Sequence, residues 1–469
     1  MIATAATSVR TTGSTLCTTS SSQVRNSFTA SSLEARPPSS LGSVAVLLDP
    51  APWHPWRDPA DVFLAVSTSH AHVFWLDAGP DAALGWSWVG WGSPADPGTV
   101  RAAAATGGST PVGESRFRGG WVGWTGYDEA ARRAGAPAAA PDDDVPPSLW
   151  IEVEGLIAFD HGSRRTQYLG DAVAGRDDAP AAQRPAAMPP VGPAHARHAP
   201  MQYASLIEEC RASIREGDAY QLCLTTRFWV EHEIDPLAAF LSLRGATPAH
   251  HAGIIMSGGV ALLSASPERF LEVSGAMVRT HPIKGTRPRG TDPAADAALA
   301  VALHDSPKER AENVMIVDLM RNDLARACLP ATVTVERLLD VESYPAVHQL
   351  VSTVAGTLRD GTTVGELLDA AFPAGSMTGA PKLSAMTILH RLEAAPRGVF
   401  AGCFGWVGAA GGLDLAMVIR SIVVHPGGAY VGAGGGITWG SVAADEVAEV
   451  GVKAQAPLAA IGADLPAGW

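Results

Sequence analysis

The sequence has few cysteines, no block of basic residues and no long apolar run, and each absence excludes a class of protein. Its five cysteines among 469 residues are scattered and never spaced Cys-x-x-Cys, so neither a disulfide framework nor a zinc site is expected. They are typical of the reduced thiols of a cytoplasmic protein. The net charge of −13, without an arginine-rich segment, argues against a nucleic-acid partner. No run reaches the roughly 18 apolar residues of a membrane helix, so no membrane span is expected.

The remaining composition predicts a folded chain with a large core. Hydrophobic residues make up 46% of the chain and charged residues 17%. Residues 1–42 differ, because they are rich in serine and threonine and contain no acid before Glu34. That composition resembles a transit peptide. We favour a disordered or over-extended N-terminus over a targeting segment, and we expect no catalytic residue in it.

Composition divides the rest of the chain into a lobe, a linker and a denser domain. Residues 43–170 form the expected N-terminal lobe, with short strands that include 62–66 and 72–76. Residues 171–200, rich in Ala, Pro and Arg, are the expected linker. The helices expected in the domain 201–462 are 203–216, 307–328, 381–392 and 444–460, and its expected strands include 221–228, 259–264, 403–407 and 417–424. Because the strands occur in blocks, we expect an α+β fold with antiparallel sheets.

Lys284 lies in a constrained turn. The surrounding sequence is Pro-Ile-Lys-Gly-Thr-Arg at positions 282–287. Pro282 fixes φ and Gly285 permits a sharp reversal, so the primary amine could be presented in a defined direction. Taken alone, this pattern fits a lysine on a surface loop at least as well as a nucleophile.

Two pairs of glutamates are spaced i, i+3 on expected helices. Glu309 and Glu312 lie at the start of one helix, where Glu309 could also close a capping box. Glu446 and Glu449 form the second pair, with Lys453 one turn later. Such pairs are common on solvated helix faces. If the two pairs converged, they could instead hold one hard cation such as Mg²⁺, which takes one or two direct carboxylates and keeps several waters.

Two glycine-rich segments and one arginine are candidates for anion binding. Gly434, Gly435 and Gly436 follow an expected short strand and could bring backbone N–H groups close to an anion. The Gly-Ser-Met-Thr-Gly segment at 375–379 lacks the ending of a phosphate loop, so a helix N-terminus that binds a carboxylate fits better. Arg420, expected within an apolar strand, needs a partner if it is buried. That partner could be a substrate carboxylate or an internal acid.

Five sequence blocks occur in an order that one enzyme family shares. The blocks are Ser-Ala-Ser-Pro-Glu-Arg-Phe (264–270), Pro-Ile-Lys-Gly-Thr (282–286), Ala-Glu-Asn-Val-Met-Ile-Val-Asp-Leu-Met-Arg-Asn-Asp (311–323), Val-His-Gln-Leu-Val-Ser (347–352) and Gly-Ala-Pro-Lys (379–382). In them the chain resembles the chorismate-utilising enzymes: anthranilate synthase component I, aminodeoxychorismate synthase component I, and the isochorismate and salicylate synthases. The resemblance implies two large antiparallel β-sheets packed face to face with helices outside. It makes 201–462 the chorismate-binding catalytic domain.

Two positions distinguish the branches of that family. Lys284 stands where anthranilate synthases have a small residue, and a lysine there marks the aminodeoxychorismate synthases. Gln221 stands where the water-using members carry a lysine base, so ammonia is a better candidate nucleophile than water. The resemblance therefore implies conversion of chorismate and ammonia to 4-amino-4-deoxychorismate, for 4-aminobenzoate and folate synthesis. The alternatives are anthranilate synthase component I and, from another class, a silent paralogue that only binds a ligand or partner.

The resemblance also implies a role for each candidate residue. Lys284 would attack C2 of the substrate, Glu268 would protonate the departing C4 hydroxyl, and His348 would act near the leaving group. The implied ligands of Mg²⁺ are Glu312 and Glu449, with Glu309 and Glu446 supporting them. The implied substrate-binding residues are Arg420, Ser376, Thr378, Gly434, Gly435, Gly436 and Lys453.

A glutamine amidotransferase subunit is the implied source of ammonia. The chain has no Gly-x-Cys-x-Gly nucleophile elbow, and Cys403 in Ala-Gly-Cys-Phe-Gly has the wrong register. Three positions depart from the family pattern: His281 where Arg is common, Phe400 where anthranilate synthases have Tyr, and Gly440 in place of an acid. These departures bear on substrate affinity.

Overall fold

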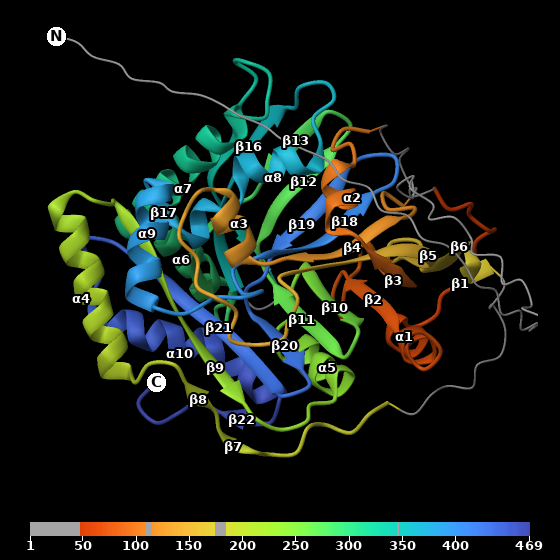
Figure 1. The fold of residues 1–469 in the computed structure, drawn as a ribbon, viewed down its shortest axis with the longest axis horizontal. Helices are drawn as coiled ribbons and strands as arrows, with labels where there is room; N and C mark the ends of the chain where they lie inside the picture. Colours follow the sequence, from red (N-terminus) through yellow and green to blue (C-terminus); the bar gives the residue numbers. More distant parts are fainter. Residues whose placement is uncertain (1–46, 108–114, 174–183, 345–346) are drawn as a thin grey trace, which may run out of the picture. The chain divides into compact units, whose positions relative to one another are not determined.

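The computed structural model describes residues 47–107, 115–173, 184–344 and 347–469 (Figure 1). The expected N-terminal segment 1–42 lies outside the described residues. Residues Ser43–Trp469 form one compact unit. Within the described part of the chain, no helix is long and apolar enough to cross a membrane.

Among the described residues, twenty strands form one continuous hydrogen-bonded set made of two antiparallel arrays that share β5. In spatial order, the first array contains β9 (Gln221–Val230), β21 (Gly428–Ile437), β20 (Ser421–His425), β11 (Val260–Ser266), β10 (His251–Ser257), β2 (His72–Asp77), β3 (Trp86–Ala95), β5 (Ser148–Asp160) and β6 (Arg165–Gly170). From β5 the second array continues through β4 (Gly120–Thr125), β18 (Cys403–Gly408), β19 (Leu413–Met417), β12 (Arg269–Ser274), β13 (Met277–Thr280) and β16 (Val347–Thr357). β14 (Ile283–Pro288) pairs with the same edge of β16 as β13, and β15 (Thr334–Ser343) pairs with the other edge of β16. Short strands at the edges are β1 (His54–Pro55), β8 (His195–Ala196) and β17 (Gly379–Ala380), and a separate pair is β7 (Gly192–Pro193) with β22 (Ala463–Asp464).

Helices cover the outer faces of the two arrays (Figure 1). The helices packed on the first array are α1 (Pro59–Ser67), α4 (Pro200–Glu216), α5 (Pro236–Ala246) and α10 (Ala443–Ala460). Those on the second array are α2 (Pro97–Ala102), α3 (Tyr127–Arg133), α7 (Pro307–Ala325) and α8 (Val364–Ala371), while α9 (Lys382–Glu393) contacts both clusters. The remaining elements are α6 (Pro293–His304) and the short 3₁₀ turns η1 (Asp171–Val173) and η2 (Gly375–Met377).

A third apolar cluster fills the space between the two arrays. Phe74 of β2 and Leu262 of β11 belong to it on one side, and Phe404 and Trp406 of β18 on the other. All four are buried, with exposed fractions of 4% or less. Alternation of side chains along each strand explains how one array can supply an inner face to this cluster and an outer face to the helices. The expected α+β fold, with face-to-face antiparallel sheets and helices outside, is confirmed.

The N-terminal lobe expected at 43–170 contributes strands to both arrays. β2 pairs with β10, and β4 pairs with β18, so strands from before and after the expected linker alternate in space. The lobe and the domain 201–462 thus share a core.

Two local expectations are wrong. Residues 62–66, expected as a strand, lie in α1, whose N-terminus is capped by Asp58. The expected strand 417–424 is divided into β19 and β20 by a break at 418–420, where Arg420 has φ of 51°. The helices expected at 203–216, 307–328, 381–392 and 444–460 match α4, α7, α9 and α10 within a few residues.

Candidate active site

Most of the candidate residues line one cavity of about 460 Å³ beside β21, between α7, α10 and β14. The predicted residues that line it are Glu268, Lys284, Glu309, Glu312, Ser376, Arg420, Gly434, Gly435, Gly436, Glu446, Glu449 and Lys453. They come from segments far apart in the sequence, and the antiparallel arrays bring them together.

The cavity opens where β20 stops and β21 continues. β20 pairs with β21 only as far as Val431, whereas β9 pairs with β21 up to Ile437. The backbone of residues 432–436 is therefore open to the cavity on the side away from β9. The glycines lie within this strand, and not after it as expected. A Cβ at Gly436 would come within 3.2 Å of Lys284 Nζ, so a bare backbone lets that amine approach closely.

Glu268 lies between β11 and β12, and its carboxylate is buried. The Ser376 hydroxyl donates a hydrogen bond of 2.9 Å to Glu268 Oε1. Burial raises the pKa of Glu268 to about 6, although Ser376 and the charges of Lys284 and Lys453 act in the opposite direction. A carboxyl group with such a pKa can hold a proton close to neutral pH, as a general acid must.

Lys284 lies on β14 and faces the cavity. Among the described residues, its ammonium group has no hydrogen bond or ion pair within 4 Å. Its charge nevertheless acts on the surrounding acids, because it lowers the pKa of Glu268 and opposes the effect of burial on Glu312. The amine is thus unengaged by the protein and close to the general acid, the arrangement that a nucleophile requires.

Besides Glu268, four acids line the cavity among the described residues: Glu309 and Glu312 come from α7, and Glu446 and Glu449 come from α10. Burial raises the pKa of Glu312. Although burial opposes it, Lys453 holds the pKa of Glu449 below its usual value. Only one of the two hydrogen bonds of the expected capping box is present: the backbone N–H of Glu309 donates to the Ser306 hydroxyl. Its carboxylate instead lies 3.5 Å from Arg287.

The acids fit a hard divalent cation in their chemistry. Glu312 Oε1 is buried without a hydrogen-bond partner, so a cation there would satisfy it. Within the part of the chain that the structure describes, no three His, Cys, Asp or Glu side chains converge closely enough to enclose a metal. Mg²⁺ does not need such an enclosure, because it commonly takes one or two carboxylates and completes its shell with water and substrate oxygen.

Two basic residues that line the cavity could bind a substrate carboxylate: Arg420, which directly precedes β20, and Lys453 on α10. Arg420 is mostly buried, and burial lowers its pKa while Glu449 raises it. Its guanidinium has no hydrogen bond or ion pair to any residue that the structure describes. Lys453 donates to the Gly434 carbonyl at 2.8 Å and lies 2.7 Å from Glu449. We expect a buried Arg420 to pair with either an internal acid or a substrate carboxylate. None of the described acids contacts it directly, which leaves the guanidinium available for a substrate carboxylate.

The structure does not bring His348 and Thr378 into the cavity. The His348 ring is 2.8 Å from Ser343 Oγ and 2.9 Å from Asp296 Oδ1, which fixes its orientation beside β15 and α6. The Thr378 hydroxyl is fully buried and donates to the Ala374 carbonyl within the η2 turn. Both side chains are engaged by the protein, so they shape neighbouring segments.

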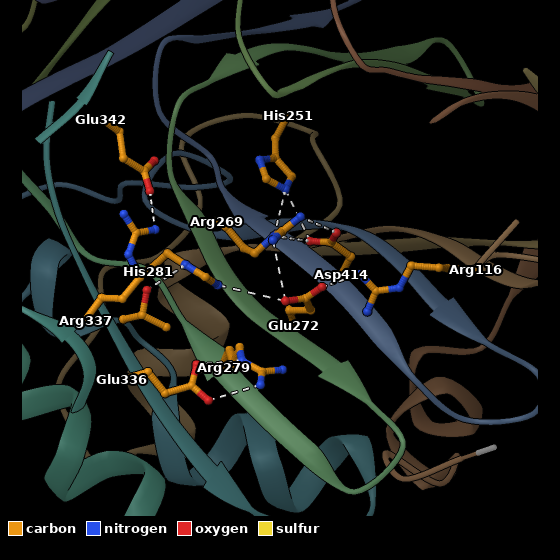
Figure 2. Close-up of polar contacts among 11 residues, drawn as sticks. Arg116, His251, Arg269, Glu272, Arg279, His281, Glu336, Arg337, Glu342 and Asp414 are labelled. Atoms are coloured by element: carbon orange, nitrogen blue, oxygen red, sulfur yellow. Dashed lines mark hydrogen bonds and ion pairs between the residues drawn. The ribbon is translucent and has the colours of Figure 1, made fainter. Parts of the chain in front are cut away.

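A network of charged side chains joins the two arrays next to the Glu268 segment (Figure 2). Arg269 donates to both oxygens of Asp414 at 3.1 Å, and Asp414 lies 3.2 Å from His251. His251 belongs to β10 in the first array, whereas the other two belong to β12 and β19. His281, a departure from the family pattern, lies 3.9 Å from Glu272 in this network and does not line the cavity.

Polar residues that line the cavity but were not among the candidates include Lys308, Arg287 and Gln349. Lys308 lines the cavity between the acids of α7 and α10. Its position four residues before Glu312 was the available signal, because that spacing places both on one helix face. Gln221 was considered only as a family marker, and its buried amide has no partner on either atom. Its amide nitrogen would lie 2.8 Å from a Cβ added at Gly436, and Lys284 Nζ would lie 3.2 Å from the same Cβ, so both side chains approach this glycine.

Comparison with known proteins agrees with this geometry. The model of a chorismate binding enzyme matches residues 95–459. The chain is 40% identical over 368 residues to an aminodeoxychorismate synthase of Streptomyces pristinaespiralis, which covers 74% of this chain and 51% of that protein. It is 37% identical over 337 residues to aminodeoxychorismate synthase component 1 of Salmonella typhimurium, covering 68% of this chain and 72% of that protein. The chain thus spans about half the length of the first of these relatives.

The fold agrees as well. The structure of anthranilate synthase component I from Streptococcus pneumoniae superposes with a TM-score of 0.69 at 26% identity, over 91% of this chain and 96% of that one. The match of the family model begins at the last residue of β3 and ends in α10, so it includes every residue that lines the cavity but not β1 or β2. With sequence, fold and site in agreement, this chain belongs to the family of chorismate binding enzymes.

Proposed function

We propose that this chain converts chorismate and ammonia to 4-amino-4-deoxychorismate, for 4-aminobenzoate and folate synthesis. The observation that carries the proposal is the presence in one cavity of an unengaged amine, Lys284, and a buried carboxyl group, Glu268, with a pKa of about 6. Displacement of a hydroxyl group needs a nucleophile and a proton donor. The names of the Streptomyces and Salmonella relatives support this choice of activity.

In the proposed reaction, the Lys284 ammonium group first loses a proton to solvent. The neutral Nζ then forms a bond to C2 of the ring, the ring double bond shifts, and the C4–O bond breaks. Glu268 gives its proton to the departing oxygen, which leaves as water. Ammonia then forms a bond to C4, the double bond shifts back, and the bond between C2 and Lys284 breaks. A proton released from the incoming nitrogen restores Glu268. The net change is chorismate plus ammonia to 4-amino-4-deoxychorismate plus water.

The acids of the cavity would hold Mg²⁺, with Glu312 and Glu449 as ligands and Glu309 and Glu446 supporting them. The unsatisfied oxygen of Glu312 supports this assignment. When bound, the cation would neutralise a carboxylate of the substrate. Arg420 and the open backbone of β21 face the same cavity and would bind the second carboxylate.

We further propose that a glutamine amidotransferase subunit supplies the ammonia and that the enzyme works in the cytoplasm. The name of the Salmonella relative, component 1, supports a partner subunit. The four cysteines that the structure describes are free and buried, which is compatible with a reducing compartment.

Product analysis tests the activity. The purified chain is incubated with chorismate, Mg²⁺ and excess ammonium, and the products are identified by mass spectrometry and chromatography. A second sample also contains aminodeoxychorismate lyase. We expect 4-aminobenzoate only in the sample with lyase. Anthranilate, formed in either sample, would assign the chain to the anthranilate synthases instead.

A Lys284→Ala variant tests the nucleophile. We expect the rate of C4 amination to fall by on the order of 10³-fold, because the covalent path is lost. Lys284→Arg is the matched control, since it keeps the positive charge and should be equally inactive. Wild-type protein incubated with chorismate without ammonium should carry an adduct on the Lys284 peptide, equal to chorismate minus water. If Lys284→Ala aminated C4 at the full rate, the proposed activity would be retained, but Lys284 would not be its nucleophile.

A further inference from the structure

Lys308 lies in the first turn of α7, and its ammonium group faces acids of both helices. Nζ is 3.7 Å from Glu446 Oε1 and 4.0 Å from Glu312 Oε1. The side chains of Glu446 and Glu312 are only 5% and 11% exposed, whereas the side chain of Lys308 is 55% exposed. A flexible, half-exposed cation therefore lies against two nearly buried carboxylates.

The contact of Lys308 with these acids is one of charge alone. Both distances are longer than a hydrogen bond, which needs about 3.2 Å or less. Glu446 Oε1 accepts its hydrogen bond from the Ser441 hydroxyl at 2.8 Å, and Glu312 Oε1 accepts none. Moving Lys308 away would break no directional bond, so another cation could replace its charge at little cost.

We propose that Lys308 competes with the divalent cation for Glu312 and Glu446, so that a metal must displace an ammonium group to enter the ligand-free protein. The inference rests on the metal site of the proposed function. It extends that function by making Lys308 a positioning residue that weakens metal binding before the substrate arrives. Lys308 is one of four lysines in the chain, and three of the four line this cavity.

The competition has a consequence for the order of binding. Two cations that share the same carboxylates repel each other, and a substrate with two carboxylates adds negative charge to the same cavity. The substrate should therefore offset the repulsion and strengthen metal binding, and the metal should strengthen substrate binding by the same factor. Lys308 makes each ligand more dependent on the other.

Titration with Mn²⁺ followed by electron paramagnetic resonance tests the proposal on the full chain without substrate. Lys308→Met keeps the length of the side chain and removes its charge. We expect it to bind Mn²⁺ about five- to tenfold more tightly, a moderate gain because Lys308 is half exposed and its charge is partly screened. Saturating Mg²⁺ should also raise the Tm of Lys308→Met more than that of the wild type.

Two variants control for other effects. Lys308→Arg keeps the positive charge, so the repulsion between the side chain and the metal stays similar. Its affinity for Mn²⁺ should be within about twofold of that of the wild type. Arg310→Met removes a charge from the same turn of α7, where the side chain donates to the His304 carbonyl and not to the acids. It should also leave the affinity within about twofold, because exposed charges farther away are screened.

Equal or weaker Mn²⁺ binding by Lys308→Met would overturn the proposal, as would an equal gain in Arg310→Met. These outcomes are separable from failure of the proposed function. If the wild-type chain aminated chorismate but bound no Mn²⁺, the proposed activity would be retained. The metal site and the role of Lys308 in metal binding would both be refuted.

Discussion

At the scale of single residues, Glu268 shows how a functional group can weaken the fold that holds it. The carboxyl group is buried, and its pKa of about 6 lies above the usual value of 4.5. A higher pKa in the folded state means that the folded chain releases this proton at higher pH than the unfolded chain. Stability is therefore lost as pH rises from 4.5 through 6, and the loss is complete at neutral pH.

Glu268→Gln should be more stable than the wild type and inactive. The difference between the two pKa values corresponds to about 2 kcal/mol at pH 7.5, and glutamine keeps an oxygen that can accept the Ser376 hydroxyl. Urea unfolding at a series of pH values measures the gain, which should vanish as pH falls to 4.5. Glu208→Gln, at an exposed residue of α4, is the control and should change stability by less than about 0.5 kcal/mol. A gain that persists at pH 4.5 would show that the ionised carboxylate is not its source.

At the scale of elements, the break between β19 and β20 is what places an arginine in the cavity. Val418 and Ile419 are apolar, and the segment 417–424 therefore resembles one strand in sequence. The left-handed backbone at Arg420 interrupts that strand, and past Val431 β21 pairs with β9 but no longer with β20. A non-glycine residue in this region carries a strain of roughly 1–2 kcal/mol. We infer that the strain is retained because it positions the guanidinium.

Arg420→Gly and Arg420→Ala should separate backbone strain from binding. Both remove the guanidinium, so KM for chorismate should rise by roughly ten- to a hundredfold, as for loss of a hydrogen bond to a charged group. Only glycine relieves the left-handed conformation, so the glycine variant should be more stable than the alanine variant by about 1 kcal/mol. KM measurements and urea unfolding check the two effects. Equal stability of the two variants would argue against strain at this position.

Local sequence patterns located most long helices and many strands, because burial of one face leaves a periodic signal in α4, α7 and α10. They failed at 62–66, where Asp58 and Pro59 start a helix whose apolar residues are almost all buried and so show no clear period. The glutamate pairs were visible by spacing, but their convergence depends on the pairing of strands far apart in the chain. Lys308 was missed because its spacing to Glu312 indicates only a shared helix face, whereas its contact with Glu446 depends on where α10 lies.

At the scale of the whole compact unit, the two arrays depend on strands from both ends of the chain. In the first array β10 lies between β11 and β2, and in the second β18 lies between β19 and β4. The inter-array cluster likewise contains Phe74 and Trp124 from before the linker and Phe404 from after it. Removing the first part of the chain would expose two long strand edges and one side of this cluster.

A truncated chain of residues 201–469 should therefore not fold independently, although its composition indicates a separate domain. It would leave β10 and β18 without β2 and β4, and unpaired edges with exposed apolar faces favour aggregation. Near-ultraviolet circular dichroism and urea unfolding check this. We expect weak aromatic signals and no cooperative transition, while the full chain unfolds in one transition that includes the tryptophans of both parts. A cooperative transition in the truncated chain would show that residues 201–462 form a domain in the thermodynamic sense. It would also show that β2 and β4 only cover a core that is complete without them.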